Sequence, residues 1–484
     1  MRICVLNPSY EGSASPFKGH DPVCNPARHA PQHDYTQLMV QKAIAGRQIR
    51  DHAHDVDLFV NLCDGAWDED RPGIDVVRVL ELLELPFTGA TSNFYEPSRE
   101  SMKRACRYQD ISTPAWRFAS TPEQIERAGE VLRYPLIIKH PSSYGSIGMT
   151  KDSRVTSAAA LRDEGLRFLA RFGEVLIEEF IEGREFTVLV SEDPDGDPHA
   201  YRPVECSFPP GETFKHFDLK WVDFAGIAWA PVADEALAAR LCDATSRMFS
   251  GLGGTGYGRA DIRVDRDGQL FVLEMNPQPG VFYPEGEYGS ADTILGLDPG
   301  GHAAFFDRIA RAALVRHTRT RKAFTIRDNG HGGFGMFAAR DLAAGEVIDP
   351  WEARPQRLVS RKHAAAWTGR MRDWFERYAW PIGEDVFAIW AEDPMDWRPI
   401  DHGCDPNAWV DGLDLVARRP IARGDAITCD YGTFCGDEMA PFTCSCGASA
   451  CRGQIRGSDW RLPAMATYGE HVSPFVAAQR RRIS

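Results

Sequence analysis

The sequence lacks the features that place a chain in or across a membrane. In its 484 residues no apolar run approaches the length of a membrane-spanning helix, and the start, MRICVLNPSYEG, has no basic segment ahead of an apolar one. The chain also lacks an excess of positive charge, because its formal net charge is -14. That balance argues against a general affinity for nucleic acid. We therefore expect a cytoplasmic protein with no signal peptide, no membrane segment and no nucleic-acid partner.

Internal repeats, low-complexity tracts and the phosphate loop GxxxxGK[ST] are also missing, so the chain is neither a repeat protein nor a P-loop enzyme. Its composition, with 43% hydrophobic and 26% charged residues, is typical of globular proteins, and its length predicts two or more domains. Twelve cysteines in a long chain without a signal peptide favour free thiols or a metal site over a disulfide framework.

The stretch GYGRADIRVDRDGQLFVLEMNPQPG, residues 256–280, predicts a β-hairpin. ADIRVD and LFVLEMN alternate apolar residues, and a D-R-D-G turn joins them. In such a hairpin Asp261 meets Glu274 and Asn276, which lie two residues apart and face one side of their strand. Oxygen ligands of this kind suit Mg²⁺ that also binds substrate phosphates. Arg259 is placed to contact a phosphate or carboxylate.

The residues before this hairpin predict an α/β unit followed by further strands. We expect a strand at ICVLN, a helix from about Tyr35 to Ile49 and a strand at DLFVNL. YPLIIKHPSSYGSIGM predicts a strand that ends at Lys139, followed by a Ser/Gly-rich loop whose backbone N–H groups can bind phosphate. EEFI at 178–181 offers backbone and carboxylate groups for an adenine.

In their order and separation these features resemble an ATP-grasp enzyme, and the chain is similar to the D-alanine–D-alanine ligase branch from about residue 50 to 315. The resemblance implies a carboxylate–amine ligase that uses ATP and Mg²⁺ and works through an acyl phosphate. It implies that Arg259 stabilises the transition state and that Asp261, Glu274 and Asn276 hold Mg²⁺. The residues it assigns to ATP are Lys103, Lys139, Glu178, Glu179, Ile181, Glu185 (for the ribose) and Lys220.

The N-terminal region departs from this family, because NPSYEGSASPFKGHDP stands where a serine/glutamate substrate segment is expected. We therefore expect a carboxylate and an amine other than D-alanine, from among amino acids or peptides.

The character of the chain changes near residue 316, where a basic, polar stretch predicts a linker into a new strand. Further on, Cys444, Cys446 and Cys451 form C-x-C-x4-C, and Cys404 lies in DHGCDPN. Four thiolates suit a closed tetrahedral Zn²⁺ site, and the alternative is a set of scattered core cysteines.

Residues from about 322 to 457 resemble a SET-domain methyltransferase with its post-SET zinc module. The similarity rests on GFGMFAARDLAAGEVI, RPIDHGCDPN, LVARRPIARGDAITCDYG and CSCGASACRGQI. It implies that Tyr431 is catalytic and that S-adenosylmethionine is bound by Gly333, Phe334, Gly335, Asp401 and His402. Asp401 stands where this family usually has asparagine, and Cys429 where it often has an aromatic residue, which leaves the degree of methylation open.

Together these features predict an α/β ATP-grasp fold, with α+β subdomains around a nucleotide cleft, followed by a mostly-β SET domain. We expect an N-terminal α/β region at 1–100, the ATP-grasp region at 101–316, a linker at 317–323, the SET domain at 324–440, the zinc module at 441–457 and a C-terminal tail at 458–484.

The first functional hypothesis is a bifunctional enzyme that ligates an amino acid or peptide and methylates an amine on the product, a carrier or a lysine-containing protein. Two alternatives are a protein-lysine methyltransferase whose ATP-grasp part only binds nucleotide or substrate, and a ligase with a non-catalytic SET interaction module. The sequence leaves the oligomer open, with a homodimer as one candidate.

Overall fold

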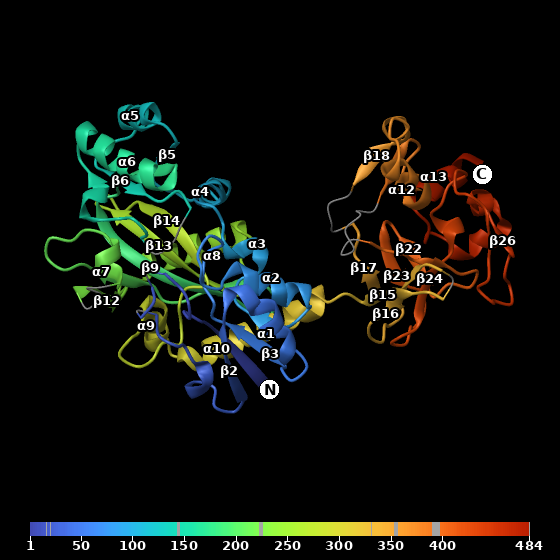
Figure 1. The fold of residues 1–484 in the computed structure, drawn as a ribbon, viewed down its shortest axis with the longest axis horizontal. Helices are drawn as coiled ribbons and strands as arrows, with labels where there is room; N and C mark the ends of the chain where they lie inside the picture. Colours follow the sequence, from blue (N-terminus) through green and yellow to red (C-terminus); the bar gives the residue numbers. More distant parts are fainter. Residues whose placement is uncertain are drawn as a thin grey trace. The chain divides into compact units, whose positions relative to one another are not determined.

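The computed structural model of the chain divides into two compact units, Met1–Thr320 and Arg321–Ser484 (Figure 1). It describes residues 1–15, 17–19, 21–142, 146–221, 226–330, 332–352, 357–389 and 397–483, without the side chains of Lys220, Trp221, Arg377 and Ile483. Among the helices of these residues, none has both the length and the apolar character needed to cross a bilayer.

The first unit begins with a four-stranded parallel sheet of order β2-β1-β3-β4. The strands are β1 (Arg2–Pro8), β2 (Asp34–Val40), β3 (Leu58–Asn61) and β4 (Phe87–Thr88), and the helices of this region include α1 (Ala45–His52) and α2 (Ile74–Leu82). The prediction of a helix from Tyr35 to Ile49 is wrong over its first half. Residues 34–40 pair with β1 along their whole length, so sheet pairing outweighs the local pattern.

A second sheet, of order β5-β8-β6-β7, carries the predicted strand that ends at Lys139. Its strands are antiparallel: β5 (Trp116–Ala119), β6 (Leu136–Lys139), β7 (Arg154–Val155) and β8 (Val175–Glu179). Helices α5 (Pro122–Val131) and α6 (Ala158–Phe172) pack on it through apolar residues such as Ile125, Leu161 and Phe168, which share one core with the strands. This shared core holds β6 and β8 in place, including the ends that carry Lys139 and Glu178.

The third sheet of the first unit has six strands and contains the predicted hairpin. Its members are β9 (Gly183–Glu192), β10 (Pro198–Ala200), β11 (Val204–Ser207), β12 (Ala228–Pro231), β13 (Tyr257–Asp265) and β14 (Leu270–Pro277). The helices that pack beside it include α4 (Arg99–Tyr108), α8 (Glu235–Gly251) and α10 (Gly301–Thr320). Because α10 continues to Thr320, the first four residues of the predicted linker are helical.

The strands of the second unit are short, and in the described residues they form four small sheets. They are β15 (Phe324–Asp328), β16 (Phe334–Ala338), β24 (Ala426–Cys429) and β21 (Asp401–His402); β17 (Val347–Asp349), β23 (Asp414–Ala417) and β22 (Ala408–Asp411); β18 (Leu358–Ser360), β20 (Val386–Ala388) and β19 (Trp380–Pro381); and β25 (Phe442–Thr443) with β26 (Gln454–Ile455). The parallel pairing of β21 with β24 brings residues 401–402 beside residues 428–429, although they are far apart in the sequence.

The C-terminal residues are folded. Two 3-10 helices, Gly457–Arg461 and Pro463–Tyr468, lead to α13 (Pro474–Ile483). Trp460, Met465, Tyr468, Val472 and Val476 form a small buried core of their own. The segment expected as a tail is therefore a packed part of the second unit.

Two candidate active sites

The β13–β14 hairpin of the first unit brings the predicted metal ligands together. Asp261 pairs directly with Glu274, and Arg259 pairs with Asn276. Asp261 Oδ2 accepts hydrogen bonds from Arg259 Nη2 at 3.0 Å and from Asn276 Nδ2 at 3.2 Å. The predicted hairpin is confirmed, and it brings Asp261 and Asn276 into direct contact, with Glu274 opposite Asp261.

Basic side chains from other elements contact the same carboxylates. Arg99 of α4 forms an ion pair with Glu274, and Lys215 Nζ lies 3.8 Å from Asp261 Oδ1. Thr187 of β9 donates a hydrogen bond to Asp261 Oδ1 at 2.9 Å. Asp261 is thus held by neighbours on both sides of β13, which limits the orientations its side chain can take.

Glu178 lies between two of the predicted ATP-binding lysines. Its carboxylate is fully buried at the end of β8, and Lys103 and Lys139 each place an ammonium nitrogen 2.6 Å from it. Burial alone would favour the protonated acid, but the two ammonium groups lower the pKa of Glu178 to about 2. This charged group holds both lysines, of which Lys139 lines the cleft and Lys103 is buried. Lys103 also donates to Thr113 Oγ1 at 2.8 Å.

The remaining residues of the predicted adenine and ribose segment have specific partners. Glu179 pairs with Arg133 at 2.8 Å, and the Ile181 carbonyl accepts from Arg263 Nη1 at 2.8 Å. Glu185 accepts two hydrogen bonds from Arg263, at 3.1 and 2.9 Å, and its other oxygen lies 2.9 Å from Lys215 Nζ. Burial opposes ionisation of Glu185, but Lys215 and Arg263 lower its pKa.

Lys215 is a candidate site residue that the sequence did not reveal. The resemblance to the ligase family pointed instead to Lys220, whose side chain lies outside the described residues. Lys215 lies five residues earlier in FKHFDLKW, and its side chain is only 14% exposed. It lies beside Glu185 and Asp261 and over the ring of Trp229 at 4.8 Å. The only signal in the sequence was the presence of two lysines in this short segment.

Two adjoining cavities of the first unit meet at these residues. The cleft is lined by Arg99, Lys139, Glu178, Ile181, Glu185, Phe214, Asp261 and Glu274, among others. The larger cavity, of about 340 Å³, is lined by Arg259 and Asn276 at one end and by Phe17, Asp64, Arg71, Trp229 and Tyr283 elsewhere. Lys215 lines both cavities. A reaction between a ligand in the cleft and a ligand in the cavity would take place beside Lys215, Arg259 and Asp261.

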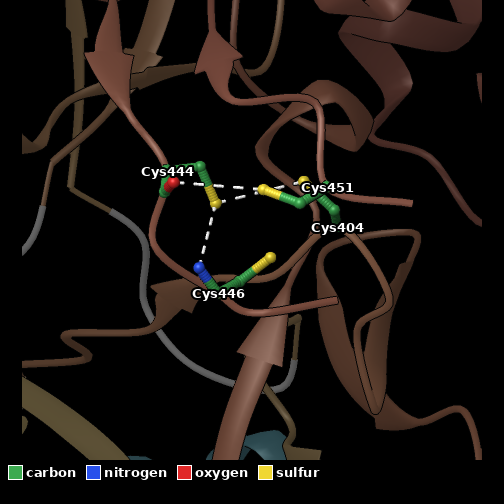
Figure 2. Close-up of side chains that lie close together, drawn as sticks. All are labelled: Cys404, Cys444, Cys446 and Cys451. Carbon is green, nitrogen blue, oxygen red and sulfur yellow. Dashed lines mark hydrogen bonds between the residues drawn. The ribbon is translucent and has the colours of Figure 1, made fainter. Parts of the chain in front are cut away.

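In the second unit, four cysteines from two segments of the chain lie together, as Figure 2 shows. The sulfur atoms of Cys404, Cys444, Cys446 and Cys451 all lie within 4.8 Å of one another, and those of Cys404 and Cys444 are 4.0 Å apart. A tetrahedral zinc site with Zn–S bonds of about 2.3 Å has sulfur–sulfur distances near 3.8 Å. The number, type and spacing of these ligands therefore fit Zn²⁺.

The predicted catalytic tyrosine follows β24 and contacts the neighbouring segment. The Tyr431 hydroxyl donates to the Ile400 carbonyl at 2.8 Å, and the Tyr431 backbone N–H donates to His402 Nδ1 at 3.2 Å. Because a backbone N–H can only donate, His402 Nδ1 is an acceptor and the ring proton resides on Nε2. Burial raises the pKa of the Tyr431 hydroxyl, so it remains protonated near neutral pH.

The glycine strand predicted to bind S-adenosylmethionine runs close to Asp401. A Cβ atom on Gly335 would lie 2.5 Å from Asp401 Oδ2, so any larger residue would collide with that carboxylate. Asn329 donates to Asp401 Oδ1 at 3.0 Å and accepts from the Gly333 N–H at 3.2 Å. The side chain of Phe334, between the two glycines, is 53% exposed. Gly333, Gly335 and Asp401 thus lie close together around Asn329, and His402 next to Asp401 contacts Tyr431.

Comparisons with known proteins assign a family model to part of each unit. Residues 105–283 match the family model for the D-ala D-ala ligase C-terminus, and residues 333–432 match the model for the SET domain. A D-alanine–D-alanine ligase of Bordetella petrii is 32% identical over 206 residues, covering 42% of this chain and 61% of the relative. The corresponding ligase of Delftia acidovorans is 34% identical over 227 residues, covering 45% of this chain and 65% of the relative. The chain therefore spans about three fifths of the length of such relatives.

Solved structures show the fold of the first unit. The D-alanine–D-alanine ligase of Coxiella burnetii superposes with a TM-score of 0.50 at 16% identity, covering 66% of this chain and 96% of that chain. D-alanyl-alanine synthetase A of Vibrio cholerae gives 0.50 at 17% identity, covering 65% and 98%. The first unit thus has an ATP-grasp fold, and a SET domain follows it in the chain. The first unit contains a domain of the D-alanine–D-alanine ligase type, so both resemblances predicted from the sequence are confirmed.

Proposed function

We propose that the chain is a bifunctional enzyme, in which an ATP-dependent carboxylate–amine ligase is joined to an S-adenosylmethionine-dependent N-methyltransferase. The observation that carries the ligase proposal is the β13–β14 hairpin. It presents Asp261 and Glu274 to the cleft and Arg259 and Asn276 to the adjoining cavity. A phosphoryl donor and a phosphoryl acceptor bound in the two cavities would meet at one point.

The charges around the cleft support a nucleoside triphosphate as the donor. The charged residues that line the cleft, together with their ion-pair partners, are seven cationic side chains and five carboxylates, which leaves a net charge of +2. The cationic residues are Arg99, Lys103, Arg133, Lys139, Lys215, Arg259 and Arg263, and the carboxylates are Glu178, Glu179, Glu185, Asp261 and Glu274. A Mg²⁺–ATP complex carries net negative charge, and buried charges must be balanced.

The proposed ligation has two steps. An oxygen of the substrate carboxylate attacks the γ-phosphorus of ATP, the bond to ADP breaks, and an acyl phosphate forms. The amine then attacks the acyl carbon, phosphate leaves, and the amine nitrogen loses a proton. Asp261, Glu274 and Asn276 would hold Mg²⁺, which neutralises charge on the transferred group when bound. Arg259 and Lys215 would stabilise the negative charge of the transition state from the cavity side.

The lining of the larger cavity supports a substrate other than D-alanine. Phe17 and Pro22, from the N-terminal segment that departs from the ligase family, form part of its wall together with Trp229 and Tyr283. Asp64 and Arg71 form an ion pair at 2.6 Å in the same wall, so charged groups face the cavity as well. An amino acid or a short peptide has the mixture of charge and apolar surface that this wall would bind.

The methyltransferase proposal is supported by the contacts of Gly335 with Asp401 and of His402 with Tyr431, beside the cysteine cluster. An amine nitrogen would attack the methyl carbon in line with the sulfur, the carbon–sulfur bond would break, and S-adenosylhomocysteine would leave. The Tyr431 hydroxyl, held by the Ile400 carbonyl, would orient the amine, because alignment supplies most of the acceleration in such a displacement. The proposed acceptor is an amine on the ligation product, a carrier or a lysine-containing protein.

Two measurements on the purified full chain test the two halves separately. Phosphate release from ATP across a panel of amino acids and dipeptides should depend on an added substrate and be lost in Glu274→Ala. Transfer of labelled methyl from S-adenosylmethionine should be lost in Tyr431→Phe. No substrate-dependent release would remove the ligase half, and no transfer to any acceptor would remove the methyltransferase half.

A further inference from the structure

Asp430, the residue before Tyr431, is a fully buried carboxylate with four hydrogen-bond donors. Arg452 donates to both of its oxygens, with Nη2 to Oδ1 and Nη1 to Oδ2 each at 2.7 Å. The Gly432 N–H donates to Oδ1 at 2.9 Å, and the Tyr468 hydroxyl donates to Oδ2 at 3.0 Å. Since acidic side chains are almost never fully buried without a partner, Arg452 is the cationic partner that allows Asp430 to be buried.

Arg452 is attached to the cysteine cluster through the backbone, because it directly follows Cys451. Its backbone N–H donates to Cys404 Sγ at 3.4 Å, and its Nε donates to Asp459 Oδ2 at 3.1 Å. The guanidinium therefore connects the backbone around the four thiols with the carboxylate next to Tyr431. A planar group with two parallel hydrogen bonds fixes the direction of its partner better than a single contact does.

Tyr468 brings a third segment to the same carboxylate. It lies in the small C-terminal core with Trp460 and Met465, and the Ser473 N–H donates to the Thr433 carbonyl at 2.8 Å. The C-terminal residues thus contact the chain on both sides of Tyr431, at residues 430 and 433. A segment predicted as a tail supports the turn that carries the predicted catalytic residue.

A parallel contact joins the cysteines to Tyr431 through His402. His402 Nδ1 accepts from the Tyr431 N–H, and its Nε2 lies 3.3 Å from Cys404 Sγ. Nε2 carries the ring proton, so this contact is a hydrogen bond donated to sulfur. Tyr431 is therefore linked to the cysteine cluster on one side through His402 and on the other through Asp430 and Arg452.

We propose that Arg452 and Tyr468 are positioning residues, which hold Asp430 so that Tyr431 and His402 keep the geometry needed for cofactor binding and methyl transfer. This inference rests on the proposed methyltransferase and goes beyond it. It assigns a role to two residues outside the predicted site, one of which, Tyr468, belongs to the C-terminal segment. The arginine acts through Asp430 and does not touch the substrate.

The test compares Arg452→Met and Arg452→Lys in the zinc-loaded full chain with Arg461→Met as the matched control. Arg461 forms a similar two-bond ion pair with Asp437 in the same region, but on the surface. We expect Arg452→Met to bind S-adenosylhomocysteine at least about tenfold more weakly and to transfer methyl on the order of 10²-fold more slowly. It should still contain about one zinc per chain, Arg452→Lys should be intermediate, and the control should equal the wild type.

A second variant covers the case in which Arg452→Met does not fold. Tyr468→Phe removes one hydroxyl from Asp430 and leaves the ring in its core, and we expect cofactor binding about threefold to tenfold weaker. Unchanged cofactor affinity in both Arg452→Lys and Tyr468→Phe would overturn the proposal. A loss of affinity that matches an equal loss of zinc would also overturn it, because Arg452 would then only hold the cysteine module together. A wild-type chain that binds no S-adenosylhomocysteine would instead refute the proposed methyltransferase itself.

Discussion

The ammonium nitrogen of Lys215 lies 2.9 Å from the Glu185 carboxylate, inside a wall shared by two cavities. Burial disfavours a charged lysine, but Glu185 and Asp261 raise the pKa of Lys215, so it remains charged. A permanent cation at this junction is suited to stabilise charge that develops between a ligand in the cleft and one in the cavity. Its position provides a specific test of the proposed ligase.

The first prediction concerns the positive charge of the Lys215 side chain. Lys215→Met should lower substrate-dependent phosphate release on the order of 10²-fold, because one preorganised charge is lost from the transition state. Nucleotide affinity should change less, since Lys103 and Lys139 remain. Steady-state phosphate release and binding of a fluorescent ATP analogue measure the two effects.

Lys151→Met is the control for a lost lysine, because Lys151 is 69% exposed and pairs with Glu212 away from the cleft. It should behave as the wild type. Equal losses in nucleotide affinity and in turnover for Lys215→Met would show that Lys215 binds the ground state only.

The second prediction concerns the metal ligands of the hairpin. Glu274→Gln keeps the size of the side chain but removes one of the two carboxylates that face each other across β13 and β14. It should weaken the Mg²⁺ dependence of nucleotide binding and remove the carboxylate that pairs with Arg99. A Mg²⁺ titration of nucleotide binding should shift to roughly tenfold higher concentration. A wild-type titration curve for this variant would exclude Glu274 as a ligand.

Local pattern was sufficient to predict the hairpin and the cysteine site. Strands alternate with a period of two residues, and a D-R-D-G turn fixes the pairing, so Asp261 and Glu274 could be placed opposite each other. Three cysteines in eight residues likewise indicate a metal module by their spacing alone. In both cases the relevant residues lie near one another in the sequence.

Features that depend on distant contacts were not predictable in this way. The segment Asp34–Val40 carries no distinctive local signal, and it is a strand because β1 offers a partner along its whole length. The choice between two lysines in FKHFDLKW depends on β9 and β13, which place Glu185 and Asp261 next to Lys215. The ion pair of Asp430 with Arg452 joins residues 22 positions apart through the fold of the cysteine module.

The third prediction concerns the metal of the second unit. Cys446→Ser should lower zinc content from about one per chain to a small fraction, because serine is a poor zinc ligand and three thiolates bind less tightly than four. Thermal unfolding of the second unit should shift to lower temperature, since metal binding stabilises the folded state. Elemental analysis and calorimetry measure both effects. Cys435→Ser is the control, because Cys435 is a free cysteine outside the cluster.

The fourth prediction concerns the pH dependence of stability in the first unit. The folded pKa of Glu178 is about 2, below the value near 4.5 of an exposed glutamate. A lowered folded pKa means that Glu178 stabilises the fold above its unfolded pKa, and that this contribution is lost as the pH falls from about 4.5 to about 2. Glu178→Gln should therefore be strongly destabilised at pH 6, and the difference from the wild type should shrink over that interval.

Urea unfolding of the first unit at several pH values measures this difference, and Glu182→Gln serves as the matched control. Glu182 belongs to the same segment, but its side chain is 47% exposed and forms ion pairs with Arg154 and Arg266. Such pairs contribute about 1 kcal/mol or less, so its substitution should produce a small effect with little pH dependence. If the difference between the wild type and Glu178→Gln stayed constant from pH 6 to pH 2.5, the ionised carboxylate would not be what holds Lys103 and Lys139 in the cleft. Their positions would then depend on neutral contacts, such as the hydrogen bond from Lys103 to Thr113.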